Sequence, residues 1–280
     1  MTSLPFLGVG LSYRWELHAS LLQAAGHVDW IEITPEHFMP LGPDGLRRLE
    51  GLARRFPVAG HSLELSLGSG GTTSARYREQ LGAILGGASA LWHGDHVCFT
   101  EAGERAIHAL TPLPFCEAAV EATVRGIREV RGALGVPLVV ENIVYYLDNP
   151  LSEMDEASFL RRVVLEADCG LLLDLHNVFT NAVNQRFDPY RFLDRLPLER
   201  VLQIHLAGGE TFEGVRLDTH AAGSPEEVWS LLDHVAPRCP VRGVNLEMDA
   251  HFLPAPRLIE ELGRARAALE RCGARGVRCA

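Results

Sequence analysis

The sequence contains no lysine, so all 26 of its Lys and Arg positions are arginines. Acidic residues number 36, which gives a formal net charge of -10, and the arginines are scattered along the chain. Nucleic-acid binding depends on clustered cations that neutralise phosphates, so this charge balance argues against a nucleic-acid partner. The chain also lacks a polybasic run that would hold it on a membrane surface.

Long apolar runs and closely paired cysteines are missing as well. No apolar run approaches the roughly 20 residues needed to span a bilayer. The N-terminal stretch MTSLPFLGVGLSYRWELHAS lacks the basic start of a signal peptide. We therefore expect a soluble cytoplasmic protein. The six cysteines form no CxxC pair and are expected to be free thiols: Cys98, Cys116, Cys169, Cys239, Cys272 and Cys279.

The sequence does contain a regular alternation of short apolar runs and longer amphipathic stretches. The expected strands cover residues 7–11, 30–33, 58–63, 92–99, 137–142, 170–175, 200–208 and 243–248. A helical pattern follows each, ending near residue 26 after the first strand and then covering 43–56, 75–88, 116–134, 155–167, 188–196, 224–235 and 255–272. Eight strand-then-helix units predict an α/β fold, a (β/α)8 TIM barrel. A doubly wound open sheet is the structural alternative.

We expect a single TIM-barrel domain over residues 1–280, with a short flexible C-terminal tail at about 273–280. No stretch has the composition of a domain linker. The glycine-rich segment GSGGTTS, residues 68–74, follows the third expected strand. It lacks the spacing of GxGxxG and of GxxxxGK[ST], so we interpret it as a flexible loop rather than a phosphate cradle.

Polar side chains gather at the ends of the expected strands, where the loops of a TIM barrel carry its chemistry. They are Glu32, His61, Asp95, His96, Glu141, Asn142, Asp174, His176, Asn177, His205, Asp218, His220, Glu247 and Asp249. Buried carboxylates are costly unless they are paired or bind a cation. Mixed imidazole and carboxylate ligands without cysteine suit iron, manganese or zinc, and their number suits two or three ions.

Each of these residues also has a structural interpretation. A lone histidine at a strand end is more often a hydrogen-bonded structural residue, and Asp174 could cap a helix. Asp218 and His220 could form a solvated loop pair. The remaining histidines are interpreted as helix-surface or loop residues: His18, His27, His93, His108 and His234. The coincidence of ligand types at one end of successive strands favours the metal interpretation.

Several motifs together resemble a known family. They are GVGLSYR, WIEITPEHFM, HSLELSLGS, DHVCFT, TPLPF, VVENIVYYL, SEMDEASFL, GLLLDLHNVFTNAVNQRFDP, LPLERVLQIHLAGG, DTH and LEMDAHF, in this order. The chain resembles the multinuclear non-heme iron-dependent oxidases, the group that includes the methanobactin-synthesis oxidase subunit. The resemblance extends from about residue 8 to residue 264.

The resemblance implies a xylose-isomerase-like barrel that holds two or three iron ions of mixed Fe(II)/Fe(III) state. It implies O2-dependent modification of a residue, usually a cysteine, in a ribosomally made precursor peptide, together with a small partner protein that recognises the leader. The implied metal ligands are His61, His96, Glu141, Asp174, Asn177, His205, Asp218, His220 and Glu247. Glu32, His176 and Asp249 are candidates for proton transfer or support of the ligands.

Three positions depart from the usual motifs of these oxidases. His176 stands where many relatives have asparagine, Gly209 ends a motif that many end with histidine, and His37 follows Pro35-Glu36 in place of asparagine. These departures change the outer part of the site, where the resemblance implies a third metal. His176 or His37 could replace a lost imidazole there.

Two other classes of function remain open at this stage. A divalent-metal hydrolase or isomerase of the xylose-isomerase-like and endonuclease IV group would place similar ligands at its strand ends. The acidic charge disfavours the nuclease, and the missing lysine disfavours a xylose-type isomerase. A barrel that only binds a leader peptide is the non-enzymatic alternative.

Overall fold

The computed structural model describes residues 4–70, 73–103 and 105–273. Apart from Gly273, the tail predicted at about 273–280 lies outside these ranges. Part of the glycine-rich loop does too, since residues 71 and 72 are not described. The five cysteines of the described ranges are free thiols. In the described chain, no helix is long and apolar enough to cross a membrane.

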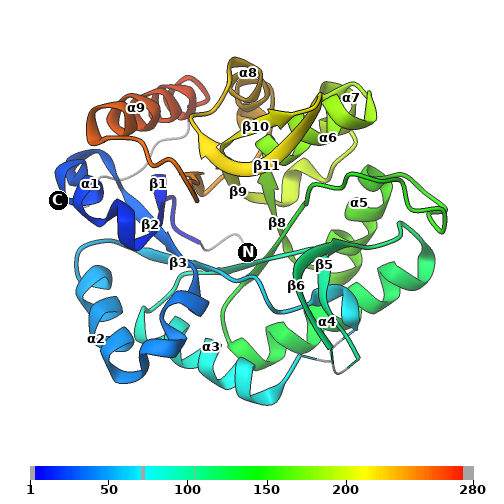
Figure 1. Ribbon diagram of the computed structural model, residues 1–280, viewed down its shortest axis with the longest axis horizontal. Helices are drawn as coiled ribbons and strands as arrows, with labels where there is room; N and C mark the ends of the chain where they lie inside the picture. Colours follow the sequence, from blue (N-terminus) through cyan, green and yellow to red (C-terminus); the bar gives the residue numbers. More distant parts are fainter. Residues whose placement is uncertain (1–3, 71–72, 104, 274–280) are drawn as a thin grey trace.

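Eight parallel strands close into a barrel in the order β1-β12-β9-β8-β7-β4-β3-β2 (Figure 1). The strands are β1 (Gly8–Tyr13), β2 (Trp30–Ile33), β3 (Val58–His61), β4 (His93–His96), β7 (Leu138–Glu141), β8 (Gly170–Asp174), β9 (Val201–Leu206) and β12 (Gly243–Leu246). Each overlaps one predicted apolar run. The predicted (β/α)8 barrel is therefore confirmed, and the open-sheet alternative is wrong.

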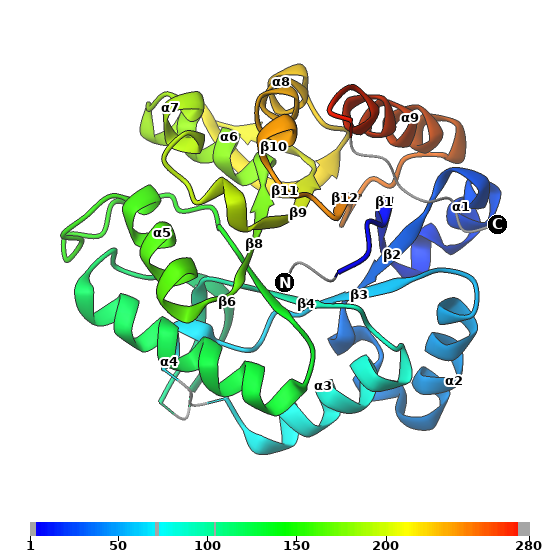
Figure 2. The ribbon, with the colours of Figure 1, turned by 180° about the vertical axis from the view of Figure 1, so that it is seen from behind.

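Helices surround the barrel on the outside (Figure 2). They are α1 (His18–Gln23), α2 (Gly42–Ala53), α3 (Ala75–Gly87), α4 (Glu117–Leu134), α5 (Glu156–Ala167), α6 (Leu175–Gln185), α7 (Pro189–Leu193), α8 (Glu226–Val235) and α9 (Ala255–Arg271). Short 3-10 helices lie at Trp15–Leu17, Ala25–His27, Pro35–His37, Met39–Leu41, Leu67–Ser69, Leu198–Arg200 and Ala236–Arg238. In α4 the buried residues Val120, Val124 and Ile127 recur at helical spacing, which puts one apolar stripe against the barrel.

Two antiparallel hairpins were not predicted. β5 (Cys98–Ala102) pairs with β6 (Arg105–Pro112) after β4, and β10 (Gly208–Phe212) pairs with β11 (Val215–Ala222) after β9. The apolar runs predicted as strands four and seven continue into these hairpins, which hid the break between the two elements. Both hairpins follow the C-terminal ends of barrel strands, and they lie in front of the barrel in Figure 1.

The helix after the sixth strand also differs from the prediction. The predicted helix 188–196 contains only the short α7, whereas α6 starts directly at Leu175 with no loop after β8. Asp174 ends the strand and caps the helix, because its Oδ1 accepts a hydrogen bond of 2.6 Å from the backbone N–H of Asn177. This direct transition fixes the direction of the Asp174 carboxylate.

The N-terminal end of the barrel interior is packed with apolar side chains. Trp30 and Trp92 lie with ring centroids 5.7 Å apart in a fully buried cluster. Gly10 makes room for Trp30, because a Cβ there would lie 2.3 Å from the indole ring. Above them, the Trp92 indole N–H donates to Gln203 Oε1 at 2.6 Å. The interior thus changes from apolar to polar toward the C-terminal ends of the strands.

Glu156, in the first turn of α5, is a buried carboxyl that makes the stability of the fold depend on pH. Burial raises the pKa of its carboxyl to about 8, although hydrogen bonds with Asn181 and Tyr145 act in the opposite direction. Between pH 4.5 and about 8, the Glu156 carboxyl therefore keeps its proton in the folded protein, whereas it loses that proton in the unfolded chain. This contribution to stability is complete below pH 4.5 and is lost as the pH rises through about 8, at up to about 1.4 kcal/mol per pH unit.

We therefore expect Glu156→Gln to flatten the dependence of the free energy of unfolding on pH between about 5 and 8. Urea unfolding at pH 5, 6.5 and 8 measures it, with Glu79→Gln, an exposed glutamate of α3, as the control. If the two variants follow the same pH profile, Glu156 is not protonated in the folded state.

Candidate metal centre

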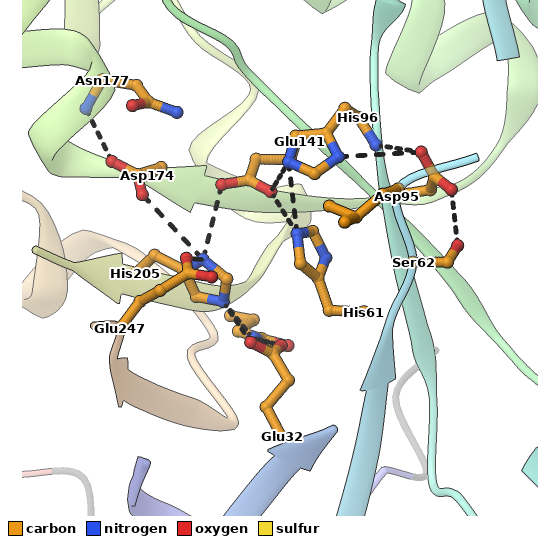
Figure 3. A network of polar contacts seen from close by, with 12 residues as sticks. Glu32, His61, Ser62, Asp95, His96, Glu141, Asp174, Asn177, His205 and Glu247 are labelled. Carbon is orange, nitrogen blue, oxygen red and sulfur yellow. Dashed lines mark hydrogen bonds and ion pairs between the residues drawn. The ribbon is translucent and has the colours of Figure 1, made fainter. Parts of the chain in front are cut away.

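Three side chains from neighbouring strands form the first group of candidate ligands. His61 ends β3, His96 ends β4 and Glu141 ends β7. Glu141 Oε2 lies 2.9 Å from His61 Nε2 and 3.2 Å from His96 Nε2, and the two Nε2 atoms are 3.3 Å apart (Figure 3). All three side chains are buried. The side chains therefore converge from three strands on one small volume.

A second group adjoins the first and shares Glu141 with it. His205 on β9 points its Nδ1 toward three carboxylates, at 2.9 Å from Glu247 Oε2, 3.4 Å from Glu141 Oε1 and 3.9 Å from Asp174 Oδ2. All four side chains are buried, and their ligand atoms lie within 4.8 Å of one another. Glu141 thus offers one oxygen to each group.

A third group lies at the outer side of the second and shares Glu247 with it. It consists of His220, Glu247 and Asp249. His220 Nδ1 lies 3.0 Å from Asp249 Oδ2, while its Nε2 lies 2.7 Å from Asp218 Oδ1. The backbone of His220 has a φ of 44°, a left-handed conformation that is rare for a residue with a side chain. Strain of this kind at a ligand-type residue is typical of functional sites.

Arg14, the residue after β1, also contacts this outer group. Its Nη2 lies 3.0 Å from Glu247 Oε1 and 2.7 Å from Asp249 Oδ1. The guanidinium occupies one oxygen of each carboxylate, which leaves the other oxygen of each directed at His205 or His220. Arg14 therefore orients both carboxylates and neutralises part of their charge.

Many ligand atoms of the centre are buried without a hydrogen-bond partner among the described residues. They are His61 Nδ1, His96 Nδ1, Glu141 Oε2, Asp174 Oδ2, Asn177 Oδ1, His205 Nδ1, Asp218 Oδ1 and His220 Nε2. Glu141 Oε2 lies within 3.2 Å of two imidazole nitrogens but forms no hydrogen bond with either. Buried polar atoms are normally satisfied, so this concentration needs an explanation. Bound cations would satisfy those atoms that face a ligand group, whereas His61 Nδ1 and His96 Nδ1 belong to rings whose Nε2 atoms face Glu141. The residues present fit such ions.

The pKa values of the carboxyl groups in the centre are shifted by the charged groups around them. Burial raises the pKa of Glu141, but nearby His61, His96 and His205 outweigh burial and hold it well below its usual range. Burial and the charge of Glu141 raise the pKa of Asp174 well above its usual range. The centre therefore requires positive charge, supplied either by protonated imidazoles or by metal ions.

Glu32, predicted as a supporting residue, lies beneath His205. Its Oε1 is 2.9 Å from His205 Nε2 and accepts hydrogen bonds from Ser12 Oγ at 3.1 Å and Asn245 Nδ2 at 3.0 Å. The Gln203 amide, which lies 2.7 Å from His205 Nε2, donates to Glu32 Oε2. With the Nε2 proton held by Glu32, the Nδ1 atom remains free to bind a metal, an arrangement common around ligating histidines.

We therefore expect Glu32→Gln to lower metal affinity by about 10- to 100-fold while leaving the ligand set intact. Competition with a chelator measures the affinity, and Glu50→Gln, an exposed glutamate of α2, is the matched control. An unchanged affinity in Glu32→Gln would assign Glu32 to the packing of the barrel alone.

The remaining predicted site residues lie beside the groups. Asn177 donates from Nδ2 to Asn142 O at 3.0 Å and keeps Oδ1 free. His176 is fully buried, with Nε2 at 3.4 Å from Thr180 Oγ1 and 3.7 Å from Asp218 Oδ1, and burial lowers its pKa to about 4. A Cβ at Gly209 would lie 2.7 Å from His176 Nε2. The imidazole of His176 thus fills the space that a side chain at position 209 would take.

A supporting network behind His96 was only partly visible in the sequence. Asp95 Oδ1 accepts from the backbone N–H of His96 at 2.6 Å, and Asp95 Oδ2 accepts from Ser62 Oγ at 2.5 Å. Ser62 Oγ also lies 2.8 Å from His93 Nε2. His93 is a fully buried residue of β4, so its interpretation as a helix-surface or loop residue was wrong. Its position in HGDH, two residues before Asp95, was the available signal.

Comparison with known proteins identifies the family of the chain. Residues 8–270 match the family described as RiPP precursor modification enzyme MbnB/TglH/ChrH, where RiPP stands for ribosomally synthesised and post-translationally modified peptide. The chain belongs to this family. It is 39% identical over 259 residues to a UPF0276 protein of Anaeromyxobacter sp. (strain Fw109-5), covering 92% of each chain. It is also 36% identical over 261 residues to a UPF0276 protein of Acinetobacter baylyi, covering 93% of this chain and 90% of the relative.

Solved structures of more distant proteins share the barrel. Endonuclease IV from Thermus thermophilus has a TM-score of 0.58 at 19% identity, with 94% of this chain and 99% of that chain covered. D-psicose 3-epimerase from Clostridium cellulolyticum has a TM-score of 0.57 at 13% identity, with 95% and 98% covered. At these identities the likeness establishes the xylose-isomerase-like barrel and nothing about the reaction.

Proposed function

We propose that the protein is an iron- and O2-dependent oxidase that modifies a cysteine of a ribosomally synthesised precursor peptide. The observation that carries the proposal is the series of three ligand groups joined by Glu141 and Glu247. Shared carboxylates of this kind suit two or three ions held close together. Membership of a family that modifies RiPP precursors supports a peptide substrate.

The residues that would hold the ions follow from the buried contacts. His61, His96 and Glu141 would hold one ion, and Glu141, Asp174, His205 and Glu247 a second. His220 would hold a third with either of two sets. Its Nδ1 faces Glu247 and Asp249, whereas its Nε2 faces Asp218. His220 Nδ1 is already hydrogen-bonded to Asp249, whereas its Nε2 has no hydrogen-bond partner. This favours Nε2 as the ligand atom, together with Asp218 and with Asn177, whose Oδ1 also has no partner.

Bound ferrous ions would supply electrons to O2 and lower the pKa of a substrate thiol. The protein's own residues would perform the positioning. Glu32 holds the proton on His205 Nε2, and Arg14 fixes Glu247 and Asp249. The apolar layer around Trp30 and Trp92 closes the N-terminal end of the barrel, so the reacting groups would meet only at the C-terminal mouth.

The proposal also includes a small partner protein that recognises the leader and a cytoplasmic location.

The test loads the purified protein anaerobically with ferrous iron and adds the cysteine-containing precursor encoded nearby, then O2. We expect two or three irons per chain, O2 uptake and a mass change in the peptide. Loaded protein that binds no iron and consumes no O2 with this peptide contradicts the proposal.

A divalent-metal hydrolase or isomerase is the second candidate, and the observation that favours it is the same set of buried ligand groups. The same carboxylate and histidine groups suit zinc or manganese. Metal analysis of protein purified without added metal separates the candidates. Iron with a visible charge-transfer band supports the oxidase, and zinc or manganese without such a band supports the second candidate.

A further inference from the structure

A cavity of about 440 Å³ lies outside the barrel, between α1 and α2. It is lined by Tyr13, Trp15, His18, Leu22, Arg48, Gly51, Leu52, Arg55 and Phe56. The two helices differ in length, since α1 has six residues and α2 has 12. Tyr13, the last residue of β1, also lines the cavity.

The lining combines aromatic surface with positive charge. Trp15 packs edge-on to Tyr13 at 5.4 Å, and the Arg48 guanidinium lies 5.5 Å from the centre of the Trp15 ring. Arg48, Arg55 and His18 line the cavity, and no acidic residue does. Within the described ranges, neither Arg48 nor Arg55 has an ion-pair partner. In a chain of net charge -10, this is a local site for anions.

Two consecutive residues at the end of β1 connect the cavity to the candidate metal centre. Tyr13 lines it, and the next residue, Arg14, contacts Glu247 and Asp249. A bound peptide that places one residue at the barrel mouth can therefore extend over the edge of the barrel toward α1 and α2. The volume falls in the range of ligand pockets, about 300–1,000 Å³, and accommodates one or two large side chains.

We propose that this cavity binds an acidic segment of the precursor peptide, with an aromatic or branched side chain inside it and carboxylates on Arg48 and Arg55. The proposal rests on the proposed function for the identity of the peptide. The apolar side chain would cover Leu22, which is 40% exposed, and contact Trp15 and Phe56. Carboxylate–arginine pairs would supply selectivity against basic segments.

The binding test uses three synthetic hexapeptides with blocked ends and the metal-loaded full chain under anaerobic conditions. The sequences are Glu-Glu-Phe-Leu-Glu-Glu, Lys-Lys-Phe-Leu-Lys-Lys and Glu-Glu-Gly-Gly-Glu-Glu, titrated by calorimetry. We expect only the first to bind measurably. We expect the double variant Arg48→Gln/Arg55→Gln, and separately Leu22→Trp, which fills the cavity, to weaken its binding at least tenfold. Arg161→Gln, an exposed arginine on α5, is the matched control.

The same variants are then tested with the encoded precursor. We expect KM for the peptide to rise at least tenfold with kcat nearly unchanged. The proposal is overturned if the variants bind and react like wild type, or if the lysine peptide binds equally well. It is also overturned if the wild type is a dimer that Leu22→Trp makes monomeric, because a second copy then covers the cavity. Failure of the wild type to modify its precursor contradicts the proposed function, whereas the hexapeptide titration still tests the cavity.

Discussion

Replacing Glu141 with glutamine is expected to remove two metal ions rather than one, and to lower the rate of peptide modification by about 10³-fold, equivalent to about 4 kcal/mol. Glu141 is the member common to the first two ligand groups and offers one oxygen to each. A glutamine keeps the shape of the side chain but not the charge that two cations would share. His96→Ala, in contrast, affects only the first group and should remove one ion.

Metal analysis and Mössbauer spectra of iron-loaded protein measure this difference. Glu121→Gln, on the exposed face of α4, is the control for the loss of one glutamate. Circular dichroism and thermal unfolding identify any variant that fails to fold. Full metal content in folded Glu141→Gln would show that the first two groups do not share this carboxylate.

His205→Ala is expected to destabilise the metal-free protein by about 3–5 kcal/mol, besides abolishing the central metal site. His205 is fully buried and contacts Glu32 and Glu247, both at 2.9 Å. Burial lowers its pKa, but these carboxylates outweigh burial and raise the pKa well above the ordinary value. Without this imidazole the two carboxylates lose their common buried partner.

Urea unfolding in the presence of a chelator measures this loss. His234→Ala is the matched control, because His234 is a partly exposed histidine of α8 that pairs with Asp194 at 2.8 Å. Exposed pairs contribute about 0–1 kcal/mol. Equal effects of the two substitutions would mean that His205 does not neutralise the buried carboxylates.

The barrel and most of the candidate ligands were predictable because both depend on local patterns. Four barrel strands each end in a polar residue of a metal-ligand type, and these strand-end residues remain buried. They are His61, His96, Glu141 and Asp174. The family resemblance placed the same residues in order. The grouping of these ligands by shared carboxylates is a finding of the structure.

The contacts that could not be predicted join residues far apart in the chain. Arg14 and Glu247 are 233 positions apart, and nothing local to either indicates the other.

The hairpins and α6 were missed for a different reason. In each case the new element begins within two residues of the end of a barrel strand, as at Asp174 and Leu175, so no turn residues mark that boundary. Such boundaries are decided by tertiary contacts rather than by propensity.

The layer formed by Trp30 and Trp92 has a consequence for the topology of the substrate. Because the barrel is sealed at one end, a peptide cannot thread through it. A target residue could reach the metals only at a free end of the chain or at the tip of a sharp bend, and the product would leave by the way the substrate came in. Precursors of this enzyme should therefore carry their reactive residue near a terminus or within a flexible turn.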